Sequence, residues 1–147
     1  MNAASGPLDI LLVDDSHTDA ELTLRALRNA ELGARGLWVT DGQVAVDYLF
    51  AEGAYRGARV ARLRLVSLDL KLPKLSGLDV LRRLKADAAR RSIPVVMLTS
   101  STEERDVLQA YELGANSYLV KPVDYGALDE VVVRAAQYWL LSNRLPQ

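Results

Sequence analysis

The sequence predicts an α/β domain built on a parallel sheet with helices on both faces. Short β-branched or Leu-rich runs alternate with longer segments of helical periodicity, which is typical of repeated strand–helix units. The chain has 147 residues, of which 50% are hydrophobic, enough for one core and too few for a comfortable second domain. We therefore expect one domain over residues 8–147, preceded by a flexible tail over residues 1–7.

The elements follow one another as five strand–helix pairs. We expect strands at residues 8–13, 35–39, 65–68, 93–98 and 117–120. Apolar residues at helical spacing follow the first four strands in turn: Ala20, Leu24 and Leu27; Val44 and Tyr48; Leu78 and Leu81; Val107 and Tyr111. Residues 51–64 contain two glycines and four arginines and fit no period, so we expect an irregular loop there.

The last predicted helix is more apolar than docking on a sheet requires. One stripe consists of Leu128, Val131, Val132, Ala135 and Trp139, while Val133, Tyr138, Leu140 and Leu141 fall largely outside it. The apolar residues outside the stripe predict a second buried surface, and we expect a homodimer formed through the fourth helix, fifth strand and fifth helix. The alternative is that the segment after Tyr138 folds back over the same monomer.

Composition excludes several classes of partner. Eighteen basic and nineteen acidic residues give a net charge of −1, and no basic helix-turn-helix pattern is present, so we expect no contact with nucleic acid. The chain has no cysteine, which rules out disulfides and thiolate metal sites. No apolar run approaches the roughly 20 residues that span a bilayer, and the start lacks the pattern of a secretory signal. These features predict a cytoplasmic protein that does not contact membranes.

Two adjacent acids end the first strand. Asp14 and Asp15 are followed by Ser16, and one acid or the serine could simply cap the next helix. A cap explains one acid and leaves the second unexplained. Two carboxylates about 4 Å apart repel by roughly 4 kcal/mol at an effective dielectric near 20, so such a pair implies a cation. Oxygen ligands without histidine or cysteine favour Mg²⁺ over zinc. We expect the lone His17 beside them to face solvent and assign it no chemistry.

Three further polar residues stand where other strands end. Asp69 follows the third strand; it could be an ordinary turn residue or, beside the acid pair and a metal ion, a nucleophile toward phosphorus that yields an acyl phosphate. Thr99 could donate to a phosphoryl oxygen, while Ser101 and Glu104 have the spacing of a capping box. Lys121 is either a surface lysine before a turn or the group that offsets phosphate charge.

The ordered motifs closely resemble the receiver domain of two-component response regulators. They are LVDDS, LDLKLPKLSG, LTSS and YLVKPVD, and the likeness covers nearly the whole chain from Leu8 onward. The resemblance implies a flavodoxin-like (βα)5 receiver fold, with a five-stranded parallel sheet of order 2-1-3-4-5.

The resemblance also implies a role for each matching residue. Asp69 would be the phosphoacceptor and would take its phosphoryl group from a sensor histidine kinase. Asp14, Asp15, Asp69 and the backbone carbonyl of Lys71 would bind Mg²⁺. Lys121 would pair with the phosphoryl group, and the peptide bond to Pro122 would be cis. Thr99 and Tyr118 would form the conformational switch, although an aromatic side chain on a short strand is more often part of a core.

Three stretches are similar to the small single-domain receivers that partner phytochrome-type histidine kinases. They are DGQVAVDYLF with the following EGAYRGA, LDLKLPK, and VVVRAAQYWLLSNRLP. The chain departs from the family at Lys71, which stands where Asn is frequent. Because the side chains of Lys71 and Ser101 would flank the path of water, the lifetime of the phosphoryl group stays open.

We therefore expect a stand-alone phosphoacceptor signalling protein and not an enzyme in the usual sense. Three alternatives remain: a phosphate shuttle or sink in a phosphorelay, a degenerate receiver serving as a scaffold, and a haloacid-dehalogenase-like phosphatase with an aspartyl nucleophile. The scaffold is disfavoured by the complete set of site residues. The phosphatase family has a second acid two residues after its nucleophile, where this chain has Lys71.

Overall fold

A five-stranded parallel sheet forms the centre of the molecule. The computed structural model describes residues 9–32, 34–57 and 63–146, so the expected tail over residues 1–7 lies outside the described residues. The strand order is β2-β1-β3-β4-β5, which confirms the predicted fold. The strands are β1 (Ile10–Val13), β2 (Gly36–Val39), β3 (Leu65–Leu68), β4 (Val95–Thr99) and β5 (Ser117–Val120).

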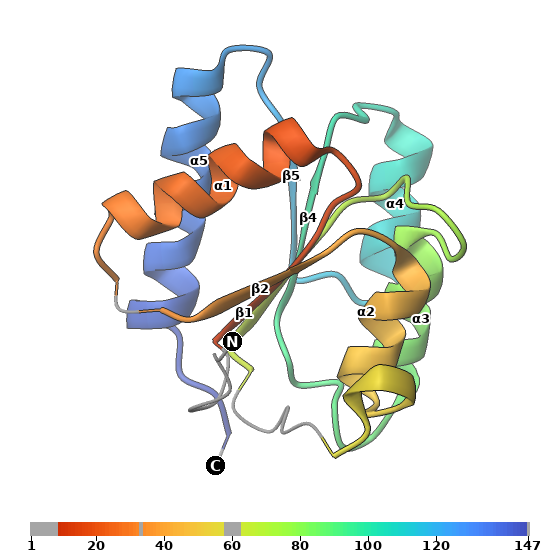
Figure 1. Cartoon of the computed structure of the whole chain (residues 1–147). Helices are drawn as coiled ribbons and strands as arrows, with labels where there is room; N and C mark the ends of the chain where they lie inside the picture. Colours follow the sequence, from red (N-terminus) through yellow and green to blue (C-terminus); the bar gives the residue numbers. More distant parts are fainter. Residues whose placement is uncertain (1–8, 33, 58–62, 147) are drawn as a thin grey trace.

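The helices cover both faces of this sheet. They are α1 (His17–Asn29), α2 (Gly42–Leu49), α3 (Gly77–Ala86), α4 (Glu104–Glu112) and α5 (Tyr125–Gln137). Helices α1 and α5 lie on one face, and α2, α3 and α4 lie on the other (Figure 1). The central strands β1 and β4 are buried along their whole length because side chains of either face meet a helix.

Several element ends differ from the prediction for local reasons. Strand β4 begins at Val95 because Pro94 has no backbone N–H to give to the sheet, and it extends to Thr99, which pairs with Val120. The expected loop contains a short 3₁₀ helix, Gly53–Tyr55, and its residues 58–62 lie outside the described residues. The capping box from Ser101 to Glu104 is wrong: the N-cap of α4 is Glu103, which makes no side-chain cap bond.

The C-terminal segment corrects one prediction about its packing. Its fully buried residues are four apart: Leu128, Val132, Ala136 and Leu140. Leu140 was expected outside the stripe but is only 2% exposed, because α5 continues as a π-helical turn, Tyr138–Ser142, that shifts the helical period. The Arg64 side chain donates to the backbone carbonyl oxygen of Leu140, so the C-terminal segment packs partly on its own monomer. Tyr138 and Leu141 stay exposed, at 51% and 64%.

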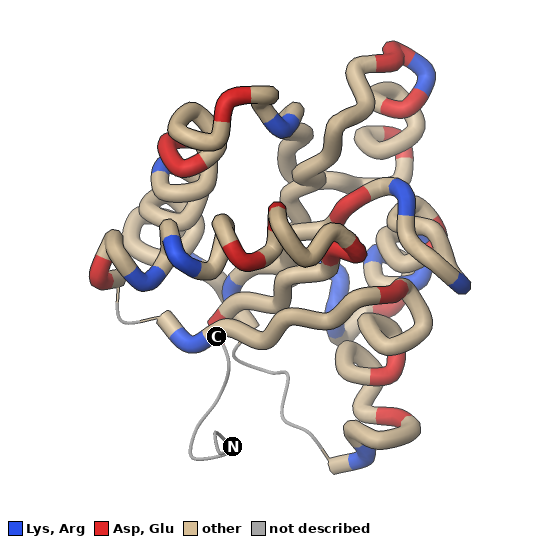
Figure 2. Tube along the Cα trace, turned by 45° about the horizontal axis from the view of Figure 1, so that its top comes forward, with Lys and Arg blue, Asp and Glu red and all other residues tan. Residues whose placement is uncertain are grey.

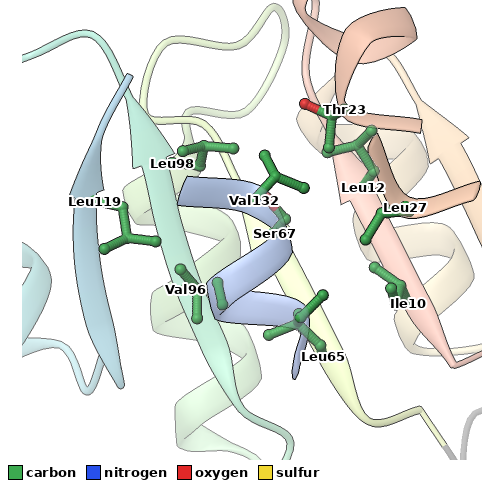
Figure 3. Close-up of a pocket in the computed structure, with 12 residues that line it drawn as sticks. Ile10, Leu12, Thr23, Leu27, Leu65, Ser67, Val96, Leu98, Leu119 and Val132 are labelled. Carbon is green, nitrogen blue, oxygen red and sulfur yellow. The ribbon is translucent and has the colours of Figure 1, made fainter. Parts of the chain in front are cut away.

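A small apolar cavity lies between the sheet and helices α1 and α5. Its volume is about 30 Å³, and side chains from β1, β3, β4 and β5 line it together with those of the two helices (Figure 3). Thr23 of α1 borders the cavity, and its buried hydroxyl oxygen has no hydrogen-bond partner. Apolar side chains fill most of the wall, so the cavity is a packing defect beneath α1.

Charge is distributed over the surface without a dominant sign. Basic and acidic residues are interspersed along the helices in the view of Figure 2, as the net charge of −1 suggests. None of the described helices is long and apolar enough to cross a membrane.

Candidate functional site

The carboxyl ends of four strands bring the predicted site residues to one edge of the sheet. Asp14 follows β1, Asp69 follows β3, Thr99 ends β4 and Lys121 follows β5. Backbone hydrogen bonds continue the sheet here: the amide of Asp69 donates to the carbonyl of Val13 at 3.0 Å, and the amide of Lys121 donates to that of Thr99 at 2.7 Å. Hydrogen bonds that continue the sheet therefore hold the backbone of these site residues.

Three acids form a compact cluster at this edge. Carboxylate oxygens of Asp14, Asp15 and Asp69 all lie within 4.8 Å of one another. Asp14 and Asp69 are 1% and 8% exposed, while Asp15 is open to solvent. Such a group of hard oxygen atoms, partly buried and with one exposed member, fits a divalent cation that keeps some of its water ligands.

Lys121 connects these acids to one the sequence analysis did not identify. Its ammonium donates to Asp14 at 2.8 Å, to Asp69 at 2.9 Å and to Asp19 at 3.0 Å, and its side chain is only 6% exposed. An ammonium has three N–H donors, so each carboxylate receives one. The sequence feature that could have identified Asp19 is the spacing Ser16-x-x-Asp19. This spacing is typical of a helix start, and it places Asp19 in the first turn after the acid pair.

The electrostatics of the pair Asp14–Lys121 follow from burial and contact. Burial raises the pKa of Asp14, and its hydrogen bonds from Lys121 and from the backbone of Ser16 offset only part of that effect. Burial acts to lower the pKa of Lys121, but the hydrogen bonds to Asp14 and Asp69 outweigh it and raise this pKa above its usual range. Lys121 is therefore a permanent cation among more numerous acids.

The loop after β1 is held from two sides. The amide of Ser16 donates to Asp14 Oδ1 at 2.9 Å, and Ser16 is also the N-cap of α1, its hydroxyl accepting from the amide of Asp19 at 3.2 Å. The capping interpretation of this motif is therefore confirmed for Ser16, and the same turn fixes the carboxylate of Asp14. From β2, the Trp38 indole N–H donates to the carbonyl of Asp14 at 2.8 Å. The ring of the exposed His17 packs edge-on against Trp38, with centroids 4.9 Å apart.

The loop after Asp69 is fixed by close packing of α3. The amide of Gly77 donates to the carbonyl of Leu70 at 2.7 Å, and a Cβ atom at position 77 would overlap the carbonyl oxygen of Asp69. Ser76 caps α3 in a capping box with Asp79. Glycine is therefore required here so that the helix can start directly against the backbone of Asp69.

Beside β4, a second polar network surrounds the loop that follows Thr99. Thr99 is 2% exposed. The Tyr118 hydroxyl donates to the carbonyl of Ser101 at 3.0 Å, and the hydroxyl of Ser101 donates to Asp106 of α4 at 2.5 Å. Tyr118 also packs against the core, and burial raises the pKa of its phenol. Its side chain thus belongs partly to the core and partly to this loop.

The side chain of Lys71 and the peptide bond before Pro122 lie next to the acid cluster. Lys71 is exposed, and it lines an open depression of about 530 Å³ together with Asp15, Leu70, Leu72, Ser76 and Asp106. The peptide bond between Lys121 and Pro122 is trans, so the expected cis bond is wrong. A trans bond is the ordinary preference for proline, and with it the Lys121 ammonium already reaches Asp14 and Asp69.

Sequence comparison identifies the family of the chain. Residues 10–133 match the model of the response regulator receiver domain, so the chain belongs to that family of signalling proteins. It is 41% identical to the probable methanogenesis regulatory protein FilR2 of Methanothrix harundinacea, over 97% of this chain and 90% of that protein. It is 36% identical to response regulator Rcp1 of Synechocystis sp., over 95% of this chain and 94% of Rcp1.

Solved structures of response regulators share its fold, and two of them are phytochrome response regulators. The phosphorylated cyanobacterial phytochrome response regulator RcpA matches with a TM-score of 0.90 and 36% identity, over 97% of this chain and all of that one. The Mn²⁺-bound form of Rcp1 matches with a TM-score of 0.88 and 36% identity, over 96% of this chain and all of that one. The bacteriophytochrome response regulator RtBRR is 46% identical, with a TM-score of 0.74, over 95% of this chain and 83% of that one.

Proposed function

We propose that this protein is a stand-alone receiver that accepts a phosphoryl group on Asp69 from a phytochrome-type histidine kinase and signals through a changed surface. The single observation that carries the proposal is the convergence of Asp14, Asp15, Asp69 and Lys121 on one edge of the sheet. The similarity to the phytochrome response regulators RcpA and RtBRR supports a phytochrome-type kinase as the donor. Exchange with such a kinase would take place in the cytoplasm, where we propose that the protein works.

We propose one receiver domain over residues 8–147, with α5 extended at its C-terminal end and a tail over residues 1–7. Asp14, Asp15, Asp69 and the backbone carbonyl of Lys71 would hold Mg²⁺, because the acids offer only hard oxygen ligands. Bound there, the ion would neutralise charge on the phosphoryl oxygens and on the acids. The Mn²⁺-bound form of Rcp1 shows that a protein of this fold and 36% identity binds a divalent cation, which supports the proposal.

The proposed chemistry uses the side chains at the strand ends. A carboxylate oxygen of Asp69 forms a bond to phosphorus while the bond from phosphorus to the donor's imidazole nitrogen breaks, and the imidazole takes up a proton. Lys121 moves one N–H from Asp69 to a phosphoryl oxygen and so balances part of the added charge. The Thr99 hydroxyl would donate to another phosphoryl oxygen, and this contact would shift the loop that holds Tyr118 through Ser101.

The test is phosphorylation by acetyl phosphate in the presence of Mg²⁺. We expect intact-mass spectrometry to show one added phosphoryl group that hydroxylamine removes, with the modified peptide containing Asp69. Asp69→Asn should remove the adduct, while Asp129→Asn, a matched change at an exposed acid of α5, should leave it. Equal labelling of wild-type protein and Asp69→Asn would refute the assignment. Rapid turnover of added phosphate esters would instead indicate a phosphatase.

The output surface that we propose is a homodimer interface on α4, β5 and α5. Exposed apolar side chains gather on these elements and on the loop after β5: Leu108, Tyr111, Val120, Val123 and Tyr125. Helix α4 begins directly after the loop that Tyr118 contacts, and Tyr118 lies on β5, so a change at Thr99 would reach this surface. Size-exclusion chromatography with light scattering at tens of micromolar should show a dimer that Tyr111→Arg weakens and Glu21→Arg on α1 does not. A monomer with and without a phosphate mimic would exclude the interface.

A further inference from the structure

We infer that Asp19 is a positioning residue for Lys121: it gives the ammonium a carboxylate partner outside the group of acids that would bind a divalent cation. The inference rests on the metal site proposed above. Of the three acids that Lys121 contacts, Asp14 and Asp69 belong to the cluster whose oxygens lie within 4.8 Å of one another. Asp19, with its oxygen 3.0 Å from the ammonium, does not belong to that cluster.

Lys121 competes with a divalent cation for the same carboxylates. Its ammonium occupies one oxygen of Asp14 and one of Asp69, and a fixed positive charge beside the acids repels a second cation. A lysine placed in this way would weaken the metal site that it is meant to assist. A third carboxylate bound to Lys121 reduces both the competition for carboxylate oxygens and the repulsion of the cation. It neutralises the ammonium, and it keeps the ammonium bound when Asp14 binds the cation instead.

The position of Asp19 suits this role. It lies in the first turn of α1, where its backbone amide is bonded to the N-cap Ser16, so the helix fixes its backbone relative to the Asp14 loop. Its side chain is 22% exposed, which leaves the carboxylate partly solvated and tolerant of a changing partner. Asp19 can therefore hold Lys121 through the changes of ligand that the other two acids undergo.

Removal of the charge at Asp19 should weaken metal binding in a way that depends on Lys121. In Asp19→Asn the ammonium would keep its full charge beside the cluster and rely more heavily on Asp14 and Asp69. We expect the affinity for Mg²⁺ to fall about three- to tenfold, as for a partly exposed charge pair. Lys121→Met should bind Mg²⁺ more tightly than the wild-type protein, because the competitor is gone.

A double-mutant cycle measured by calorimetric titration with Mg²⁺ tests the inference. It compares wild-type protein, Asp19→Asn, Lys121→Met and the double variant, all without a phosphodonor. If Asp19 acts through Lys121, the effect of Asp19→Asn should shrink to less than about twofold in the Lys121→Met background. Glu21→Gln is the charge-matched control on α1, because residues two apart on a helix do not face the same side; it should stay within about twofold of wild type.

Each outcome decides the inference. Wild-type affinity in Asp19→Asn would overturn it, and so would an equal loss in both backgrounds, which would mean that Asp19 acts on the metal site directly. A wild-type protein that binds no Mg²⁺ would overturn this inference together with the metal site, whereas the first two outcomes leave that site standing. Circular dichroism verifies that each variant is folded, and Lys121→Gln replaces Lys121→Met in the cycle if the latter is not.

Discussion

Replacement of Lys121 by Met should destabilise the metal-free protein, and Mg²⁺ should restore much of the loss. In the wild-type protein the ammonium is the common partner of three carboxylates at 2.8 to 3.0 Å. Without it, Asp14 and Asp69 face each other with carboxylate oxygens within 4.8 Å. At that separation two unit charges repel by about 3.5 kcal/mol at an effective dielectric of 20. Breaking a buried ion pair costs a similar ~3–5 kcal/mol.

The full repulsion is not reached, because one acid can take up a proton instead. The pKa of Asp14 is already raised by burial, and loss of the contact with Lys121 would raise it further. We therefore expect Lys121→Met to lower the free energy of unfolding at pH 7 by about 3 kcal/mol. A domain of ordinary stability, about 5–15 kcal/mol, would still fold.

Urea unfolding at pH 7, first in EDTA and then in Mg²⁺, measures both parts of the prediction. A cation bound only by the folded state stabilises it by about 2.7 kcal/mol at 100 times its dissociation constant. The gain should be larger for Lys121→Met than for wild-type protein at the same Mg²⁺ concentration, since the variant presents uncompensated acids.

Lys85→Met is the matched control. Lys85 is half-buried, whereas Lys121 is buried, and the Lys85 ammonium donates to three neutral oxygens: those of Arg91 at 2.9 Å, Ile93 at 2.8 Å and Asn116 at 3.1 Å. Its loss should also cost stability, and Mg²⁺ should not compensate for it. The reasoning is refuted if Lys121→Met costs less than about 1 kcal/mol, or if Mg²⁺ stabilises it no more than the wild-type protein.

Three further predictions follow from single contacts. Burial raises the pKa of Asp14 above 3.8, so its ionised carboxylate lowers the stability of the folded state, and Asp14→Asn should stabilise the metal-free protein at pH 7. This gain should fade as the pH falls through the raised pKa of Asp14 and vanish below 3.8. Urea unfolding in EDTA at several pH values would measure it. Thr23→Val removes a buried hydroxyl that has no hydrogen-bond partner, so thermal unfolding should show that the free energy of unfolding rises by about 1 kcal/mol. A fall in the free energy of unfolding would mean that water in the cavity hydrogen-bonds to the hydroxyl. Gly77→Ala should destabilise by about 1–3 kcal/mol and slow phosphorylation, because its Cβ would displace the backbone of Asp69; unchanged kinetics would contradict this.

The positions of the main site residues were predictable from the sequence because they depend on strand direction alone. Parallel strands end at the same edge of a sheet, so polar residues directly after Val13, Leu68 and Val120 had to meet there. The strand order, by contrast, came from the resemblance of the motifs to receiver domains, since alternation of strands and helices is compatible with several orders. Both expectations agree with the structure.

The contacts that the sequence did not reveal depend on how neighbouring elements are oriented. Asp19 reaches Lys121 only because α1 starts close to the end of β5, and Trp38 reaches the Asp14 carbonyl only because β2 pairs with β1 in a particular register. Leu140 was misplaced for a different reason: a π-helical turn inserts an extra residue into the period, so a pattern counted at 3.6 residues per turn assigns it to the wrong face.

The acidic loop caps a helix and also contributes to an excess of negative charge at the site. Ser16 caps α1 and thereby fixes the amide that binds Asp14 Oδ1, so the same turn that starts the helix also aims a carboxylate at the cluster. Four acids lie at this edge, Asp14, Asp15, Asp19 and Asp69, and Lys121 contacts three of them. That excess of negative charge cannot be neutralised by Lys121 alone, and a phosphoryl group would increase it. The fold therefore provides a site that is incomplete without a further cation, which is the physical reason to expect phosphorylation of Asp69 to require a divalent metal.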